Sequence, residues 1–332
     1  MKALILAGGF ATRLWPLCEN RAKPLLLLDG KTILAHILEK IPNEIETILL
    51  TNSKFFADFQ VELKKLGRKN IEIFCEDAYA DGQKLGALGA ISAVSREKNI
   101  NETILVLAGD NILPELKIEQ LYCANNEAKI AAREVSSFHE ARKFGVLKIA
   151  DGRVVDFAEK PEKPFSKIVS TGFMALGKDF LPILHNFAEK SPDALGGIFP
   201  ELLAQGKSVL ADVIKGDWFD IGSFETYLEA HQQLQKEDLL DSREIFHKFE
   251  LNESKHVVPS SNLKKISNQY SGKVFIGKNC EIEDCKLHNV IVYPNTKLKN
   301  CQISHSVIDE NCHLEGLDLN KKLIRAGMKM VF

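Results

Sequence analysis

Short apolar runs alternate with helical patterns through the first half of the chain. The runs ALILA (3–7), ETILLT (46–51), IEIFC (71–75) and TILVLA (103–108) have the length of buried strands. Apolar residues recur at helical spacing over 33–41, 53–66 and 84–97, and Thr32 is a predicted helix N-cap. The alternation predicts an α/β fold, with a Rossmann-like, mainly parallel sheet that helices cover on both faces.

The pattern changes after residue 143. FGVLKIADGRVVDFAEKP (144–161) has a strand, an Asp-Gly turn and a strand, which is typical of a hairpin. Further strand-like runs occur at 168–176 and 208–214, and helical patterns at 178–190, 197–206 and 223–237. The stretch 238–270 is charged and irregular. We therefore predict a first domain over 1–237 and a linker over 238–270.

The tail contains an internal repeat. Segments 274–289, 290–305 and 306–321 align with a period of sixteen residues. Apolar positions correspond in all three, and one register holds Asn279, Asn295 and Asn311, a residue type that tolerates a left-handed turn. The period predicts a short β-solenoid over 271–332.

The seven cysteines are an odd number and form no C-x-x-C pair, so we expect free, mostly buried thiols in a reducing cytoplasm. Four of them lie in the repeat, where small apolar residues are needed inside, and a zinc site stays an alternative. The net charge of −2 provides no field for nucleic acid or an anionic membrane. Met1-Lys2 leads directly into the first apolar run, and no run approaches a membrane span, so we expect no targeting segment and no membrane partner.

The candidate chemistry begins at LAGGFATRL (6–14), where the first strand ends. The spacing departs from the dinucleotide fingerprint G-x-G-x-x-G, and the Gly-Lys-Ser/Thr of a P-loop is missing. What remains is a flexible turn followed by two cations, Arg13 and Lys23. Such a turn could bind an anion through its backbone N–H groups and a guanidinium. The alternative is a surface turn with solvated charges.

Two aspartates are candidate metal ligands. Asp110 follows the apolar run LVLAG, which puts it at the carboxyl end of a buried strand, and Asp220 lies in the apolar setting DWFDIG. Magnesium takes one or two carboxylates and completes its shell with phosphates and water. The alternative for Asp110 is a helix cap or turn. Glu159-Lys160, considered alone, reads as a solvated loop.

Taken together, these segments resemble the sugar-1-phosphate nucleotidyltransferases, also called nucleotide-sugar pyrophosphorylases. The resemblance rests on five motifs in the family's order: LAGGFATRLWPL with AKPLLLLDGKTILAHIL, GDN (109–111), 144–161, STGFMAL (170–176) and WFDIGS (218–223). The tail resembles the left-handed β-helix that many members carry. The resemblance implies that a nucleoside triphosphate (NTP) and a sugar 1-phosphate give a nucleotide-sugar and pyrophosphate, with Mg²⁺ as cofactor.

The resemblance also implies roles for residues around the phosphates. The backbone of Leu6, Ala7, Gly8 and Gly9 forms the nucleotide loop. Arg13 neutralises the β- and γ-phosphates, and Lys23 bridges the α-phosphate and the sugar phosphate. Asp110 and Asp220 hold the magnesium ion.

On the sugar side, the resemblance implies that Glu159 reads hydroxyls, Lys160 meets the sugar phosphate, and Thr171 and Gly172 line the pocket. Two departures stand out. Ala11 replaces a glycine that many members have, so this position either avoids positive φ or is strained. A proline of the family is replaced within Leu27-Leu28, a change we attribute to packing.

The sequence leaves open which nucleotide base the protein binds. By the resemblance, Gly86 in KLGALGAI (84–91) packs against the base. The base edge would be read from just upstream, where Glu76, Asp77, Asp81 and Gln83 are available, and we name Asp81 with Gly86 as predicted nucleotide-binding residues. A carboxylate only accepts hydrogen bonds, which suits guanine, whereas a glutamine suits uracil or thymine. We favour GTP with mannose 1-phosphate; dTTP or UTP with glucose 1-phosphate stays open.

Two rival interpretations remain. One is a catalytically inactive regulatory subunit that binds nucleotide-sugars, although it should have lost Arg13, Lys23, Asp110 or Asp220. The other is a bifunctional enzyme with an acyltransferase β-helix, for which three rungs are few. We predict instead that the β-helix tail supports a homo-oligomer.

Overall fold

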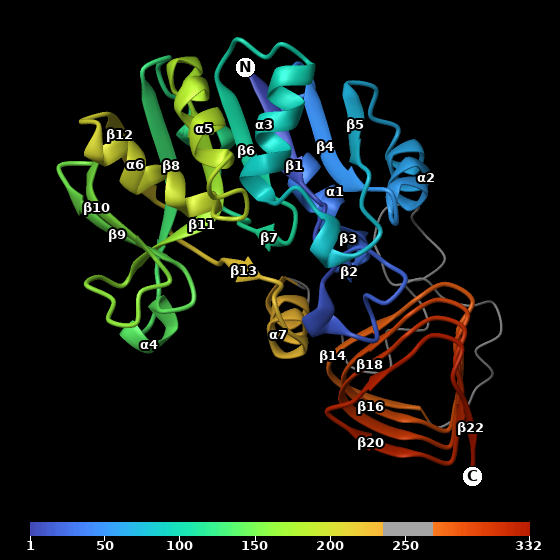
Figure 1. Cartoon of the computed structure of the whole chain (residues 1–332). Helices are drawn as coiled ribbons and strands as arrows, with labels where there is room; N and C mark the ends of the chain where they lie inside the picture. Colours follow the sequence, from blue (N-terminus) through green and yellow to red (C-terminus); the bar gives the residue numbers. More distant parts are fainter. Residues whose placement is uncertain (235–267) are drawn as a thin grey trace. The chain divides into compact units, whose positions relative to one another are not determined.

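The computed structural model describes residues 1–234 and 268–332 of the chain. Contacts divide it into two compact units (Figure 1). The first unit consists of Met1–Phe10, Ala22–Leu25 and Ile33–Asp220, and the second of Ala11–Arg21, Leu26–Thr32 and Ile221–Phe332. The first unit thus ends at Asp220 rather than at 237, and short segments near the N-terminus belong with the β-helix. The predicted linker, 238–270, lies outside the described residues as far as residue 267.

A nine-stranded sheet organises the first unit. Its order is β5 (Ile71–Glu76), β4 (Thr47–Asn52), β1 (Lys2–Leu6), β6 (Ile104–Ala108), β11 (Ile168–Leu176), β8 (Glu127–Glu134), β12 (Ser208–Val213), β10 (Arg153–Glu159) and β9 (Gly145–Ala150). The four strands predicted in the first half form its parallel part, β5-β4-β1-β6. β11 then runs antiparallel to both of its neighbours, β6 and β8, so the sheet is mixed beyond the parallel core.

Alternation along the strands buries both faces of the parallel part. Leu4, Ile48 and Val106 face one core, to which the three helices α3 (Ala87–Glu97), α5 (Leu181–Ala188) and α6 (Ile198–Ala204) contribute (Figure 1). The intervening residues Ile5 and Leu49 are also buried. Continuous burial explains why these strands have unbroken apolar sequences.

The first unit also contains helices, short strands and 3₁₀ turns outside the sheet and the three helices above. They are α1 (Ile33–Leu38), α2 (Phe56–Leu66), α4 (Phe138–Ala141), β7 (Asn111–Ile112), β13 (Phe219–Asp220) and the 3₁₀ turns η2 (Lys23–Leu25), η3 (Asp81–Gln83), η4 (Ile118–Leu121), η5 (Lys178–Phe180) and η6 (Leu195–Gly197). None of the described helices is long and apolar enough to cross a membrane.

The hairpin predicted over 144–161 is confirmed. β9 and β10 pair antiparallel, and Asp151 and Gly152 between them have φ of 49° and 75°, as a type I′ turn requires. Thr32, predicted to cap a helix, ends strand β3 (Lys31–Thr32) and directly precedes α1, which is the N-cap position.

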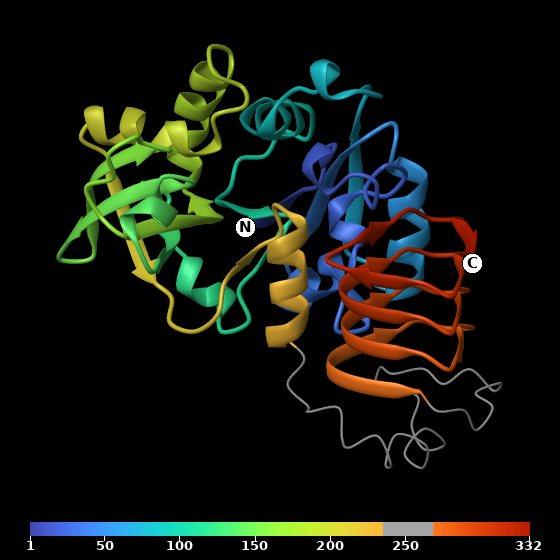
Figure 2. The same cartoon turned by 90° about the horizontal axis from the view of Figure 1, so that it is seen from below.

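The second unit joins a β-helix to α7 (Phe224–Leu234), η1 (Thr12–Leu14) and the β2 (Leu27–Leu28)–β3 ribbon. Figure 2 shows the stacked rungs of the β-helix. Its strands are β14 (Gln269–Ile276), β15 (Glu281–Glu283), β16 (Lys286–Val292), β17 (Lys297–Lys299), β18 (Gln302–Ile308), β19 (His313–Glu315), β20 (Asp318–Asn320), β21 (Leu323–Ile324) and β22 (Lys329–Val331).

The sixteen-residue period of the tail is confirmed. Ile276, Val292 and Ile308 pair in register along β14, β16 and β18. Asn279, Asn295 and Asn311 have φ of 58°, 59° and 60°, the left-handed turn conformation predicted for this register. The four cysteines of the β-helix are free and buried in its core, as predicted, and all four thiols contact backbone carbonyls.

Candidate functional site

Two neighbouring parallel strands of the first unit end at the candidate site. β1 ends at Leu6 and β6 at Ala108, so the segments that follow them emerge at the same edge of the sheet. The Gly109 amide donates to the Leu6 carbonyl at 2.9 Å. A Cβ added to Gly109 would lie 2.4 Å from that oxygen, so only glycine permits this approach. The glycine loop after β1 and the aspartate after β6 are therefore held together.

Lys23 and Asp110 form an ion pair at this edge. The Lys23 Nζ lies 2.8 Å from Asp110 Oδ2, and the exposed fractions of the two side chains are 13% and 32%. Lys23 begins η2, whose next residue, Pro24, packs beside Gly109. The structure thus brings together the predicted phosphate-binding cation and the predicted metal-binding carboxylate.

Asn111 and Trp218 orient the Asp110 carboxylate. Asn111 Nδ2 donates to Asp110 Oδ1 at 3.0 Å, and Trp218 Nε1 donates to Asn111 Oδ1 at 2.7 Å. β13 pairs with β7 so that Asp220 lies opposite Asn111. The two predicted metal-binding aspartates therefore lie on adjacent segments. Sequence reasoning did not assign a role to Asn111 or Trp218, although both fall inside the GDN and WFDIGS motifs.

The donor set at this edge suits a hard cation. Asp110 and Asp220 provide carboxylate oxygens, and Asn111 already fixes the orientation of Asp110. One or two carboxylates, completed by phosphate and water oxygens, are what Mg²⁺ uses in proteins. The residues present therefore fit a magnesium ion.

Two buried polar side chains hold the glycine loop. Asn52, which is fully buried, donates from Nδ2 to the Gly8 carbonyl at 2.9 Å. A Cβ added to Gly8 would lie 3.0 Å from Glu76 Oε1, so the loop passes directly over this carboxylate. The other Glu76 oxygen accepts from the Leu85 amide at 2.7 Å, and burial raises the pKa of Glu76. Glu76 is thus the one of the four base-reading candidates shown to lie against the glycine loop.

The other three candidates are engaged elsewhere. Asp77 accepts from Ser53 Oγ, Asp81 pairs with Lys84 at 3.1 Å, and Gln83 accepts the amides of Tyr79 and Ala80 with its Oε1. The Asp81 side chain is 60% exposed. Glu76 therefore has a better position for reading a base beside the glycine loop than Asp81, the residue named from the sequence.

Gly86 has a structural partner that the sequence did not reveal. Its φ is +78°, and an added Cβ would lie 2.7 Å from the Pro192 carbonyl carbon and oxygen. The same Pro192 oxygen accepts the amides of Leu88 and Gly89 at the start of α3. The bare face of Gly86 thus meets the Pro192 backbone, and the expectation that Gly86 packs against a base stays a prediction.

Gly172 and Thr171, both predicted to line the sugar pocket, have different surroundings in β11. β11 is irregular between Ser170 and Met174, and Gly172 there has φ of +79°. A Cβ on Gly172 would lie 2.9 Å from the Cβ of Ala108, so Gly172 adjoins the end of β6. Thr171 donates its hydroxyl to the Ala131 carbonyl at 2.8 Å and is 1% exposed. The Thr171 hydroxyl is therefore used within the sheet, and the role of Thr171 in the sugar pocket stays a prediction.

Glu159 ends strand β10, and Lys160 directly follows it. The carboxylate of Glu159 lies 3.9 Å from Lys160 Nζ, and burial raises the pKa of Glu159. The Lys160 amide donates to the Phe144 carbonyl at 3.1 Å, and the Phe144 ring contacts the Trp218 ring at 4.7 Å between centroids. Because Trp218 also binds Asn111, this pair is connected to the Asp110 segment by packed aromatic side chains.

Arg13 belongs to the second unit. It lies in η1 and its side chain is exposed. Ala11, which ends the glycine loop, has φ of +51°. Of the two alternatives for this position, the structure adopts the strained one, since an alanine there occupies the left-handed region that favours glycine.

Comparisons with known proteins give the family. The family model described as nucleotidyl transferase matches residues 2–237, which is more than half of the chain. The chain belongs to the nucleotidyl transferase family. This confirms the resemblance drawn from the five motifs.

Individual relatives differ in length and name. The chain is 33% identical over 231 residues to the bifunctional protein GlmU of Methanococcus maripaludis, covering 67% of the chain and 51% of that protein. It is 30% identical over 325 residues to the glucose-1-phosphate adenylyltransferase of Clostridium novyi, covering 90% and 82%. This nucleotidyl transferase chain thus spans about half the length of the GlmU relative.

A solved structure shares the fold. It is the crystal structure from Bacillus anthracis named "Putative Glucose-1-Phosphate Thymidylyltransferase", with a TM-score of 0.61 and 22% identity. The match covers 73% of this chain and 98% of that one. The likeness confirms the α/β fold expected from the sequence.

Proposed function

We propose that the protein transfers a nucleoside monophosphate from an NTP to a sugar 1-phosphate and releases pyrophosphate. The observation that carries this proposal is the Lys23–Asp110 ion pair, 2.8 Å long, beside the glycine loop. A cation and a carboxylate at the edge of a parallel sheet are what two phosphate substrates and a divalent ion require. Membership of the nucleotidyl transferase family supports the same chemistry.

In the proposed reaction, a sugar phosphate oxygen attacks the α-phosphorus of the NTP. A new P–O bond forms, the bond from the α-phosphorus to the bridging oxygen breaks, and pyrophosphate leaves with that oxygen. The ammonium of Lys23 holds the two reacting phosphates together, and the exposed Arg13 offsets the charge of the leaving group. Because the reactants need only be aligned and neutralised, positioning supplies most of the catalysis.

Asp110 and Asp220 would hold a magnesium ion, as the oxygen donors at this edge suggest. Bound there, the ion would add positive charge next to the phosphates. Asn111 keeps the Asp110 carboxylate in one orientation for this task. On the sugar side, Glu159 accepts hydrogen bonds from hydroxyls and Lys160 offers a charge to the sugar phosphate. Gly172, whose lack of a side chain lets it lie close to Ala108 at the end of β6, would line the sugar pocket.

For the base, we favour guanine. Glu76 lies against Gly8, and an ionised carboxylate accepts hydrogen bonds without donating any. Guanine offers N1–H and N2–H₂ donors, whereas uracil and thymine present a mixed edge. The relatives are named for adenylyl and thymidylyl transfer as well, so their names do not select the base. Mannose 1-phosphate stays the first sugar to test.

A pyrophosphate-release screen tests the proposal. GTP, ATP, UTP and dTTP are each paired with glucose, mannose, galactose and glucosamine 1-phosphates, with and without Mg²⁺. We expect release that needs both substrates and the metal, and highest activity with GTP. Release only with another triphosphate would overturn the guanine assignment. No release with any pair, together with tight binding of a nucleotide-sugar, would favour the inactive regulatory subunit.

A further inference from the structure

One column of the β-helix departs from the apolar repeat. Tyr293, Asp309 and Arg325 are sixteen residues apart, each directly after a strand of the same sheet. Their backbones continue the regular stacking, since the Tyr293 amide donates to Ile308 and the Asp309 amide to Ile324. Their side chains, however, are an aromatic alcohol, an anion and a cation. We call these three residues the polar column.

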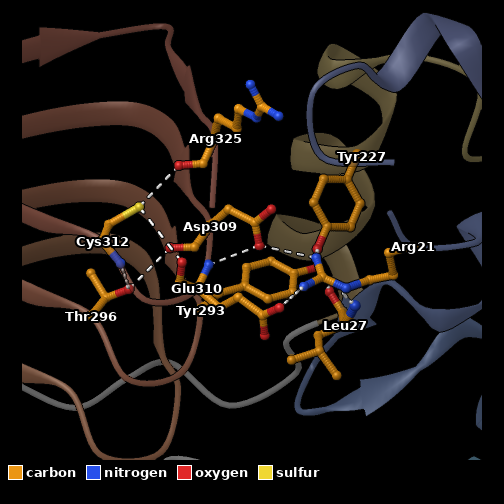
Figure 3. A network of polar contacts seen from close by, with 9 residues as sticks. All are labelled: Arg21, Leu27, Tyr227, Tyr293, Thr296, Asp309, Glu310, Cys312 and Arg325. Atoms are coloured by element: carbon orange, nitrogen blue, oxygen red, sulfur yellow. Dashed lines mark hydrogen bonds and ion pairs between the residues drawn. The ribbon is translucent and has the colours of Figure 1, made fainter. Parts of the chain in front are cut away.

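The polar column binds Arg21. Arg21 Nη1 donates to Asp309 Oδ1 at 3.0 Å, and its Nη2 lies 3.1 Å from Glu310 Oε1. The guanidinium carbon lies 4.7 Å from the centre of the Tyr293 ring (Figure 3). The Arg21 side chain is 17% exposed and that of Asp309 only 4%. A guanidinium that is stacked and doubly paired in this way has one preferred position.

Tyr293 also binds the backbone of Leu27. The Leu27 amide donates to the Tyr293 hydroxyl at 3.1 Å, and the Leu27 carbonyl accepts from the Tyr227 hydroxyl at 2.6 Å. The two hydroxyls are 2.9 Å apart. Because Tyr227 uses its proton on Leu27, Tyr293 donates to Tyr227. Each hydroxyl proton has an acceptor, which makes this small network fully connected (Figure 3).

The third member of the polar column, Arg325, binds Glu19. Its Nε and Nη2 atoms lie 2.8 and 2.9 Å from the two carboxylate oxygens, a bidentate pair. Three successive rungs of the β-helix therefore bind three residues of the segment 19–27. These residues are Leu27, Arg21 and Glu19.

These residues flank Lys23 on both sides. Ala22–Leu25 belongs to the first unit, where Lys23 meets Asp110, whereas its two neighbouring segments belong to the second. The chain therefore leaves the polar column at Arg21 and returns to it at Leu27. Fixing both ends of so short a segment restricts the positions that Lys23 can reach.

We propose that the polar column is a clamp that positions Lys23 for the reaction, which makes Tyr293, Asp309 and Arg21 positioning residues. The proposal rests on the proposed function for its kinetic consequence and on the contacts above for the clamp. Loosening the clamp lets Lys23 sample positions away from the reacting phosphates. A misplacement of about 1 Å can cost as much as a hundredfold in rate.

Tyr293→Phe in the full-length protein tests the clamp, because it deletes one hydroxyl and keeps the ring under Arg21. Its matched control is Tyr270→Phe, at the other tyrosine of the β-helix, whose hydroxyl is hydrogen-bonded with Asn268. We expect Tyr293→Phe to speed hydrogen exchange of the Leu27 amide about tenfold. It should also speed labelling of Lys23 by an amine reagent and lower kcat about tenfold, with KM within about twofold. Tyr270→Phe should change none of these.

A second variant, Asp309→Asn, removes the charge opposite Arg21 and should raise Lys23 labelling in the same way. Unchanged Lys23 labelling in both variants would overturn the clamp. A kcat equal to that of Tyr270→Phe, despite faster exchange, would overturn the positioning role. If the unmodified protein releases no pyrophosphate with any substrate pair, the proposed function fails, while exchange and labelling still decide the clamp.

Discussion

Two ion pairs, whose cations Arg21 and Lys23 lie two residues apart in the chain, differ in exposure and, in the proposed function, in purpose. Lys23–Asp110 in the first unit and Arg21–Asp309 in the second have similar lengths, 2.8 and 3.0 Å. They differ in exposure, because the Asp110 side chain is 32% exposed and that of Asp309 is 4%. The Asp110 carboxylate is therefore open to solvent and that of Asp309 is nearly closed to it, while the two cations, Lys23 and Arg21, are similarly shielded at 13% and 17%.

The choice of cation fits this difference. Lysine carries a compact charge on a flexible stem and can turn from a carboxylate to a phosphate. Arginine is planar, and Arg21 uses that plane to stack on Tyr293 while its edge contacts Asp309 and Glu310. Charged residues close together in the chain can thus have opposite purposes, which burial and stacking distinguish.

The largest expected effect comes from breaking the reacting pair. Lys23→Ala should lower kcat by about 10³-fold, since it removes a cation that acts on the transferred phosphate. Stability should fall by less than about 1 kcal/mol, because Asp110 stays partly solvated. Steady-state pyrophosphate release and urea unfolding measure the two effects.

The matched control is Lys84→Ala, which breaks another lysine–aspartate pair, 3.1 Å long, in the same unit. It should leave kcat within about threefold of the unmodified protein. Equal losses in the two variants would remove the distinction between a reacting pair and an ordinary one.

Breaking the closed pair should act on stability instead. Arg21→Ala leaves Asp309 buried without its cation and should cost about 3–5 kcal/mol in urea unfolding. Arg96→Ala, which breaks an exposed pair with Glu189, should cost less than about 1 kcal/mol. A similar small cost for both would show that the Arg21 pair is not closed to solvent.

The pH dependence of that loss has a definite sign. Burial raises the pKa of Asp309, and Arg21 opposes this rise. Without Arg21, the folded-state pKa should lie further above the unfolded value. Stability of the variant is then greatest below the unfolded pKa and is lost as pH rises through the folded pKa. The deficit of Arg21→Ala should therefore shrink on acidification, and a deficit that grows would contradict the assignment.

Much of this architecture could be read from periodicity. The parallel strands have continuous apolar runs because both faces are buried, and the β-helix repeats with the period that its register demands. β8 was missed because its sequence, EAKIAARE, contains four charged residues. β8 lies between β11 and β12 in the sheet, and its residues Ala128, Ile130 and Ala132 are buried in the core. Tertiary burial there overrides local propensity.

The candidate site was predictable in its charges and not in its hydrogen bonds. Lys23 and Asp110 follow recognisable motifs, but the bond from Trp218 to Asn111 joins residues 107 positions apart and depends on the pairing of β7 with β13. The polar column was hidden for a similar reason. Tyr293, Asp309 and Arg325 break the apolar repeat, and only their partners reveal why.

A more moderate effect is expected where the glycine loop meets Glu76. Glu76→Gln replaces an acceptor-only group by a mixed one and should lower kcat/KM with GTP by about 10–100-fold. Because burial raises the pKa of Glu76, the charged form costs stability at neutral pH, so the amide should unfold at an equal or higher temperature. Asp77→Asn, beside Ser53, is the matched control and should be neutral. Unchanged preference for GTP in Glu76→Gln would exclude this carboxylate as the base reader.

The smallest effect should come from Ala11, at the end of the glycine loop. Ala11→Gly relieves an alanine at φ of +51° and should raise stability by up to about 1 kcal/mol. Ala93→Gly, inside α3, should lower it by about 1 kcal/mol, since glycine weakens a helix interior. Thermal unfolding measures both, and a destabilised Ala11→Gly would show that the strain at residue 11 is compensated locally.

Whether Asp110 takes part in the reaction is decided by pyrophosphate release from the unmodified protein and from Asp110→Ala, measured at increasing Mg²⁺ with GTP and mannose 1-phosphate. We expect release that rises with Mg²⁺ in the unmodified protein, and at least about a 10³-fold lower rate in a stably folded Asp110→Ala. Full release by Asp110→Ala would contradict the account, because the carboxylate that pairs with Lys23 would then have no part in the reaction.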